Sequence, residues 1–124
     1  LKDNSETLKV LGDGNQKKPY CHVSDLVEAM WFGYRESREQ INCFNIGTSL
    51  THTSVKFIAE QFAGAFEKKN GVLPQLSYTG GKKGWVGDVA EFKYSTEKIN
   101  ALGWKPKMSS DDAIRKAIEE ILEE

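Results

Sequence analysis

Two pairs of lysines and one aspartate are the residues of this chain best suited to bind a charged ligand. Lys82 and Lys83 lie in a glycine-rich stretch that ends just before Asp88, and Lys17 and Lys18 follow a turn. Glycine lets a ligand approach the backbone, lysine pairs with phosphate, and a carboxylate accepts hydrogen bonds from hydroxyl groups. Together they could bind a phosphorylated ligand. The alternative is a solvated surface loop, which charged, glycine-rich segments usually form.

A second candidate is Tyr94, which is followed four residues later by Lys98. This is the spacing of the acid–base pair of short-chain dehydrogenases, in which the lysine lies one helical turn away and lowers the pKa of the tyrosine. Here the helix is expected to start at residue 95, so the two side chains would not share a helical face. No nucleotide-binding unit precedes them within this chain. We therefore predict no catalytic residue.

Metal and dinucleotide sites are not expected either. The spacings between Cys21, His22, Cys43 and His52 match no zinc pattern. The G-D-G run at 12–14 lacks the third glycine and the helix that a dinucleotide fingerprint needs, so it predicts a turn. No cofactor is predicted within this chain.

Composition narrows the class of protein. The chain has 124 residues, enough for one domain, and its 17 basic and 18 acidic residues give a net charge of -1, which does not favour a nucleic-acid partner. Its apolar runs are far shorter than the roughly 20 residues that span a bilayer. Two cysteines favour a reduced, cytoplasmic setting. The start at Leu1 instead of methionine suggests a fragment.

The sequence predicts a mixed α/β fold, whose strands and helices hold these residues in place. Alternating patterns and turn signals predict strands at 8–11, 20–23, 41–46 and 73–78, the first two as a hairpin or as neighbours, and a loop at 79–87. Helices are expected from Ser24 or Asp25, from Thr53 or Ser54 to residues 70–71, over 95–101, and from Ser109 or Ser110. About four short strands are fewer than the usual sheet contains, which suggests an incomplete sheet.

Three of these helices carry apolar faces. The faces consist of Leu26, Val27, Met30 and Tyr34 in the first, of Val55, Ile58, Ala59, Phe62 and Phe66 in the second, and of Ile114, Ala117, Ile118, Ile121 and Leu122, expected to point inward, in the last. They need more sheet to cover them than the chain supplies.

Five segments form a pattern in a fixed order. They are L-K-V-L-G-D-G-N-Q-K-K-P-Y-C-H-V-S-D-L at 8–26, F-N-I-G at 44–47, S-V at 54–55, G-D-V at 87–89 and L-G-W-K-P at 102–106. In this order and spacing they resemble the extended short-chain dehydrogenase/reductase family, particularly UDP-glucose 4-epimerase and its relatives among the epimerases and dehydratases. The resemblance covers nearly the whole chain.

The resemblance implies a division of labour. Such enzymes hold NAD and the catalytic Tyr/Lys pair in an N-terminal part with a Rossmann sheet, and their C-terminal part grips the nucleotide diphosphate of the sugar. This chain resembles only the C-terminal part. Residues 1–124 would then be a single substrate-binding domain for a UDP-sugar, with the NAD-binding domain absent and no activity alone.

The resemblance also assigns substrate contacts by position. Lys18 stands where an arginine contacts the diphosphate, and Asp88 would accept a hydrogen bond from the ribose. Trp85 takes the place of a second phosphate-binding arginine, and Lys83 is the nearest basic residue. The complete predicted set is Lys18, Tyr20, Val55, Lys83, Asp88 and Phe92.

Two alternatives belong to other classes of protein. The chain could be a stand-alone nucleotide-sugar-binding module. It could also be a self-associating structural fragment, since uncovered helix faces and sheet edges tend to bind another chain, as in a homo-oligomer.

Overall fold

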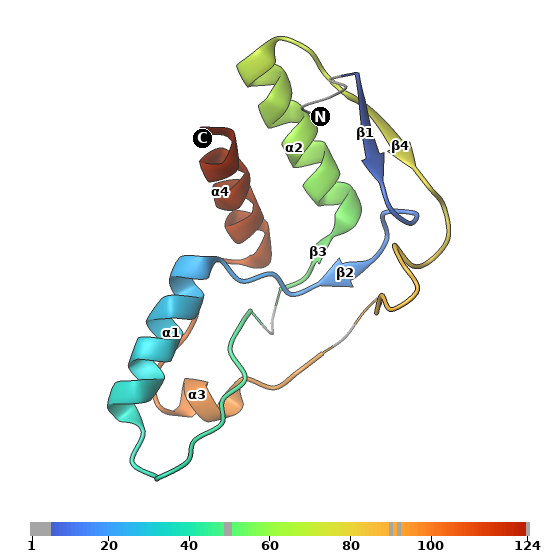
Figure 1. The fold of residues 1–124 in the computed structure, drawn as a ribbon. Coiled ribbons are helices and arrows are strands. Elements are labelled where there is room, and N and C mark those ends of the chain that lie inside the picture. The colour runs from blue at the N-terminus through green and yellow to red at the C-terminus, as the bar shows by residue number, and fades with distance from the viewer. Residues whose placement is uncertain (1–5, 49–50, 90, 92, 124) are drawn as a thin grey trace.

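A computed structural model describes residues 6–48, 51–89, 91 and 93–123. It contains the strands β1 (Thr7–Val10), β2 (Lys17–Lys18), β3 (Thr53–Ser54) and β4 (Gln75–Tyr78). Its helices are α1 (Val23–Glu36), α2 (Val55–Asn70), α3 (Glu97–Ala101) and α4 (Ser110–Glu123). Helix α2 lies between the β1–β4 pair and α4, while α1 and α3 form a second group at the other end of the molecule (Figure 1). The predicted mixed α/β class is confirmed.

The strands form two separate pairs. β1 pairs in parallel with β4, so that Thr7 lies opposite Gln75, and β2 pairs antiparallel with β3. The predicted pairing of 8–11 with 20–23 is therefore wrong. A turn with positive φ at Gly12 and Gly14 separates β1 from β2, and the Gln16 side chain closes this turn by donating to the Leu11 carbonyl at 3.2 Å.

Residues 20–23 do not form the predicted strand. The Tyr20 amide donates to the Ser110 side chain at 2.9 Å instead of joining a ladder. Helix α1 then begins at Val23, because His22 caps it, its Nδ1 accepting from the Ser24 amide at 3.2 Å. The predicted caps, Ser24 and Asp25, lie inside the helix. The buried Asp25 carboxylate instead accepts from the amides of residues 107 and 108.

The predicted strand at 41–46 is also absent from the described part of the chain. A strand needs a neighbour to satisfy its amides and carbonyls, and none of the described strands lies beside this segment. Its apolar side chains pack elsewhere. Phe44 and Ile46 cover a buried cluster of Ala29, Ile99 and Trp104 that joins α1 to α3.

Helix α2 follows the sequence pattern closely. The Ser54 side chain accepts from the Phe57 amide at 3.1 Å, and Gly71 ends the helix in the left-handed conformation at φ 75°. Of the expected stripe, Ala59 is buried and the larger members are half-buried.

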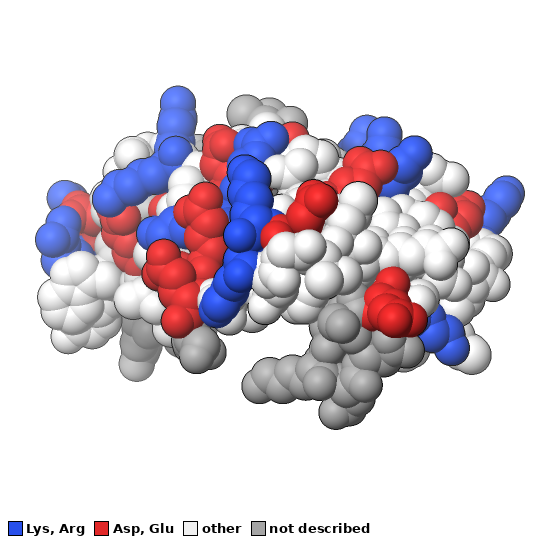
Figure 2. Space-filling view, turned by 90° about the horizontal axis from the view of Figure 1, so that it is seen from above, with Lys and Arg blue, Asp and Glu red and all other residues white. Residues whose placement is uncertain are grey.

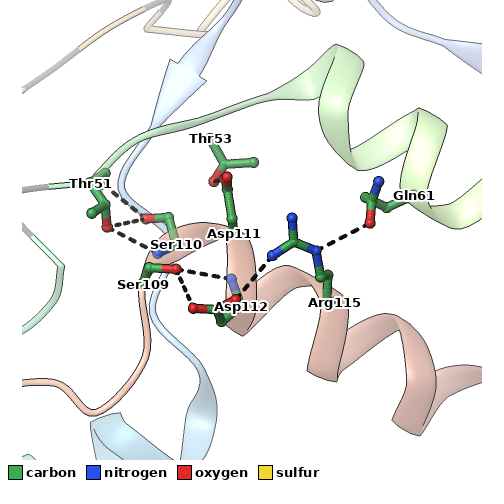
Figure 3. Close-up of polar contacts among 8 residues, drawn as sticks. All are labelled: Thr51, Thr53, Gln61, Ser109, Ser110, Asp111, Asp112 and Arg115. Carbon is green, nitrogen blue, oxygen red and sulfur yellow. Dashed lines mark hydrogen bonds and ion pairs between the residues drawn. The ribbon is translucent and has the colours of Figure 1, made fainter.

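Helix α4 packs against α2, and polar contacts join its first turn to Thr51 and to Thr53 of β3 (Figure 3). The fully buried Ser110 hydroxyl bonds to the Thr51 carbonyl at 2.9 Å, and Arg115 donates to Gln61 of α2 at 3.3 Å. Ile118 is buried as predicted, but Ile121 is exposed and lines an open groove together with residues 20–23.

The apolar face of α1 is exposed rather than buried. Its buried side consists of small or polar residues, Asp25, Ala29 and Gly33. The opposite stripe is left in water and consists of Val23, Leu26, Val27, Met30, Trp31 and Tyr34. This face has no cover within the described residues.

Charge is distributed evenly where the surface can be viewed. Basic and acidic side chains are interspersed over the face seen from above (Figure 2). None of the described helices is long and apolar enough to cross a membrane.

Candidate functional site

The centre of the candidate site is an ion pair between residues far apart in the sequence. The Lys18 ammonium of β2 donates to Asp88 Oδ1 at 2.5 Å. The Asp88 side chain is buried, whereas the Lys18 side chain is 29% exposed and so keeps part of its charge accessible to a ligand. β2 is held in place by its pairing with β3, which itself leads directly into α2.

Asp88 also organises the glycine-rich loop. Its Oδ2 accepts from the Gly84 amide at 3.0 Å, and its own amide donates to the Trp85 carbonyl at 3.0 Å. The Lys18 hydrogen bond, followed by the one from Gly84, lowers the pKa of the Asp88 carboxyl below its ordinary value. The carboxylate is thus held in its charged form, and both its oxygens are already oriented.

Tyr20 lies two residues after Lys18 and is half-buried. Burial raises the pKa of its phenol, while the charge of Lys18 lowers it and that of Asp88 raises it again. The phenol therefore stays neutral and can donate a hydrogen bond. Its backbone is fixed by Ser110, which accepts from the Tyr20 amide at 2.9 Å, so α4 positions this residue.

Among the described contacts, Val55 and Lys83 make no hydrogen bond or ion pair with Lys18 or Asp88, and their roles stay predictions. Val55 begins α2 and lines an apolar groove of about 470 Å³ together with β1 and Phe62. Lys83 is exposed in the loop and has no ion-pair partner among the described residues. Phe92 lies outside the described residues.

Tyr94 and Lys98 have different neighbours. Tyr94 precedes α3, and its hydroxyl lies against Gly47, where an added Cβ would collide with it. The Lys98 ammonium lies 4.9 Å from the centre of the Phe44 ring, within range of a cation–π contact.

The glycines of the first turn offer no cradle for a dinucleotide. The space above Gly12 is filled by the Gln16 side chain and that above Gly14 by the Tyr78 ring. No helix begins at this turn to direct amides at a pyrophosphate. These residues do not fit NAD. Within the described residues, no group of three His, Cys, Asp or Glu side chains could hold a metal ion.

Sequence reasoning missed two contributors to the site. Ser110 was expected only to start a helix, whereas its hydroxyl ties α4 to the segment that carries Tyr20. The Gly84 amide was the second, because residue type alone does not distinguish Gly84 from the other glycines of the loop. Only the spacing of Gly84 to Asp88, typical of a closed turn, could have indicated it.

Comparison with known proteins supports one family. A family model described as GDP-mannose 4,6 dehydratase matches residues 1–117. The dTDP-D-glucose 4,6-dehydratase of Mus musculus is 27% identical over 115 residues, covering 87% of this chain and 30% of the mouse protein.

Solved structures extend the likeness to the fold. A crystal structure of UDP-galactose 4-epimerase matches with a TM-score of 0.73 and 25% identity, covering 98% of this chain and 37% of that chain. The UDP-glucose 4-epimerase of Thermotoga maritima, solved with UDP-glucose, matches with a TM-score of 0.68 and 26% identity, covering 96% of this chain and 36% of that one. The chain thus spans between 30% and 37% of the length of these three relatives.

Proposed function

The chain belongs to the GDP-mannose 4,6-dehydratase family, and from this membership we propose that it is the nucleotide-sugar-binding portion of an NAD-dependent epimerase or dehydratase. The expected ligand is a UDP-sugar or a related nucleotide sugar. Two of the structural relatives are named as UDP-sugar epimerases, and one of them was solved with UDP-glucose.

The observation that carries the proposal is the ion pair of Lys18 with Asp88. It joins a partly exposed cation to a buried, oriented carboxylate at one place. Lys18 offers its charge to the diphosphate, and Asp88 accepts a hydrogen bond from a ribose hydroxyl. Tyr20 adds a neutral phenol, and Lys83 adds a second cation from the exposed loop. Phe92 and Val55 complete the proposed contacts.

We expect NAD to be bound by another part of the parent protein and not by this chain. The space at the first-turn glycines is filled by neighbouring side chains, the Tyr94 hydroxyl lies against Gly47, and the Lys98 ammonium lies over the Phe44 ring. The residues of this chain therefore bind and orient the nucleotide sugar, and the hydride chemistry that NAD supplies would take place in the remainder of the parent protein. We expect no turnover by the chain alone.

Equilibrium binding of UDP-glucose to the 124-residue chain, measured by calorimetry, tests the proposal. Lys18→Ala should weaken binding by about tenfold or more, because a charge-assisted hydrogen bond is lost. Lys17→Ala is the matched control, since Lys17 is the exposed neighbour on the same strand. Equal effects of the two substitutions would reject Lys18 as the phosphate contact.

Self-association is a second candidate property, and the exposed stripe of α1 favours it. Six large apolar side chains, from Val23 to Tyr34, lie on one face of the helix and are 40% exposed or more. Such a continuous apolar surface is typical of a protein interface. The occupant proposed for it here is a second copy of the chain.

A further inference from the structure

Trp85 is the largest side chain left exposed beside the ion pair of Lys18 with Asp88. It is 66% exposed, although an indole ring is among the most favourable side chains to bury. The other tryptophan near a packed group, Trp104, is only 4% exposed. An aromatic ring held in water beside charged ligand-binding groups is a surface on which another flat ring can stack.

The indole ring lies against the backbone of its own loop. Its six-membered ring lies against Gly87, so closely that a Cβ added to that glycine would collide with it. The absence of a side chain at residue 87 thus lets the ring fold back over the backbone. A ring packed in this way loses little conformational entropy when a ligand stacks on it.

The loop also ties Trp85 to the ion pair. The Asp88 amide donates to the Trp85 carbonyl at 3.0 Å, and the Asp88 carboxylate is held by Gly84 and Lys18. Lys18, Asp88 and Trp85 therefore bring a cation, a hydrogen-bond acceptor and an aromatic ring to one region of the chain. A nucleotide carries the matching groups, a phosphate, a ribose and a base.

We propose that Trp85 is the stacking platform for the nucleobase of the bound nucleotide sugar. The inference rests on the proposed function, since Lys18 and Asp88 define where the phosphate and ribose lie. A stacked base is recognised by its flat face rather than by its edge, so this contact favours any nucleotide over a simple sugar phosphate.

Binding of UDP and of ribose 5-phosphate to the chain separates the base from the rest of the nucleotide. Trp85→Ala should weaken UDP binding about tenfold and leave ribose 5-phosphate binding unchanged. Gly87→Ala should also weaken UDP binding, because the new methyl group displaces the ring while φ at this residue is ordinary for an L-amino acid. Trp85→Phe should retain part of the affinity.

Two other exposed apolar residues serve as controls. Val86, which is 97% exposed in the same loop, and Trp31, an exposed tryptophan on α1, should both tolerate alanine without a change in UDP binding. UDP binding that Lys18→Ala weakens and Trp85→Ala does not would overturn this inference alone. Weaker binding of UDP-glucose but not of UDP to Trp85→Ala would assign the ring to the hexose and also overturn it. Failure of the unaltered chain to bind any of these ligands overturns both this inference and the proposed function.

Discussion

The Asp88 carboxylate and the Lys18 ammonium hold each other in place before any ligand arrives. Their hydrogen bond orients both groups, but it also means that a phosphate must share the ammonium with the carboxylate. The lysine, a point charge with three donors, can do this because one donor faces Asp88 and others remain. The pair is therefore an oriented site of low net charge rather than an open cationic pocket.

Acid should weaken this site in a defined pH range. The folded-state pKa of Asp88 lies below its unfolded value of about 3.9, so its contribution to stability is complete above that pH and is lost as pH falls through the folded pKa. The melting temperature measured against pH should fall less steeply below about pH 4 in Asp88→Asn than in the unaltered chain. Asp13→Asn, which alters a carboxylate in the nearby turn with no cation partner among the described residues, should behave as the unaltered chain. Identical slopes for Asp88→Asn and the unaltered chain would show that the ion pair contributes nothing to folding.

The sequence indicates the chemical role of a single residue better than it indicates which residues lie close together in the fold. Lys18 and Asp88 were assigned by position, and the structure brings them to within 2.5 Å of each other. Val55 was assigned in the same way and lines an apolar groove next to β1, so its contact with a ligand stays a prediction. A sequence pattern predicts which residues face a common ligand only when the path of the loop between them is known. In the glycine-rich loop, this path depends on hydrogen bonds such as that from the Gly84 amide to the Asp88 carboxylate.

At the scale of elements, local signals succeed where the element is stabilised locally. Helix α2 is capped by Ser54, one of the two predicted caps, and by Gly71 at its end, because a side-chain cap and a left-handed glycine act within a few residues. The segment 41–46 has a strand pattern but pairs with no strand of the described residues, and it stays irregular. At the start of α1, a histidine took the cap position, and histidine is not among the residues that usually signal one.

Two glycines of the α2 region should respond oppositely to alanine. Gly71 has φ 75° and Gly64 lies within the helix, and no atom lies within 4 Å of a Cβ added at either position. Only backbone conformation distinguishes them, so Gly71→Ala should destabilise the chain by about 1 kcal/mol and Gly64→Ala should stabilise it by about 0.5–1 kcal/mol. Urea unfolding followed by circular dichroism measures both. A loss of stability in both variants would mean that α2 does not end as described.

At the scale of the whole molecule, the most prominent surface feature is the exposed apolar stripe of α1. The chain covers only 36% to 37% of the two epimerase structures that it matches. Its own core, built around Ala29, Ile99 and Trp104, uses only the opposite side of α1. The large apolar side chains of α1 are thus placed for a contact outside the described residues, and no sequence pattern could have indicated which side of this helix faces the core.

Charging this stripe should reduce association between copies. The double substitution Val27→Lys and Met30→Lys alters side chains that are 59% and 61% exposed, so folding should be retained. Sedimentation velocity should then show a shift from dimer towards monomer at equal concentration. Val72→Lys is the control, an exposed apolar residue just beyond α2 that should leave the dimer intact. A monomeric unaltered chain would remove self-association as a property.

Thermal unfolding with and without UDP-glucose tests the central claim most directly, because it requires no assumption about catalysis. A ligand present at a hundred times its dissociation constant stabilises the folded chain by about 2.7 kcal/mol, which raises the melting temperature by several degrees in a chain of this size. We expect a clear rise for the unaltered chain and for Lys17→Ala, and about half that rise or less for Lys18→Ala, because tenfold weaker binding leaves the ligand at only about ten times its dissociation constant. A melting temperature that UDP-glucose does not change would contradict the claim that this chain contains a nucleotide-sugar-binding site.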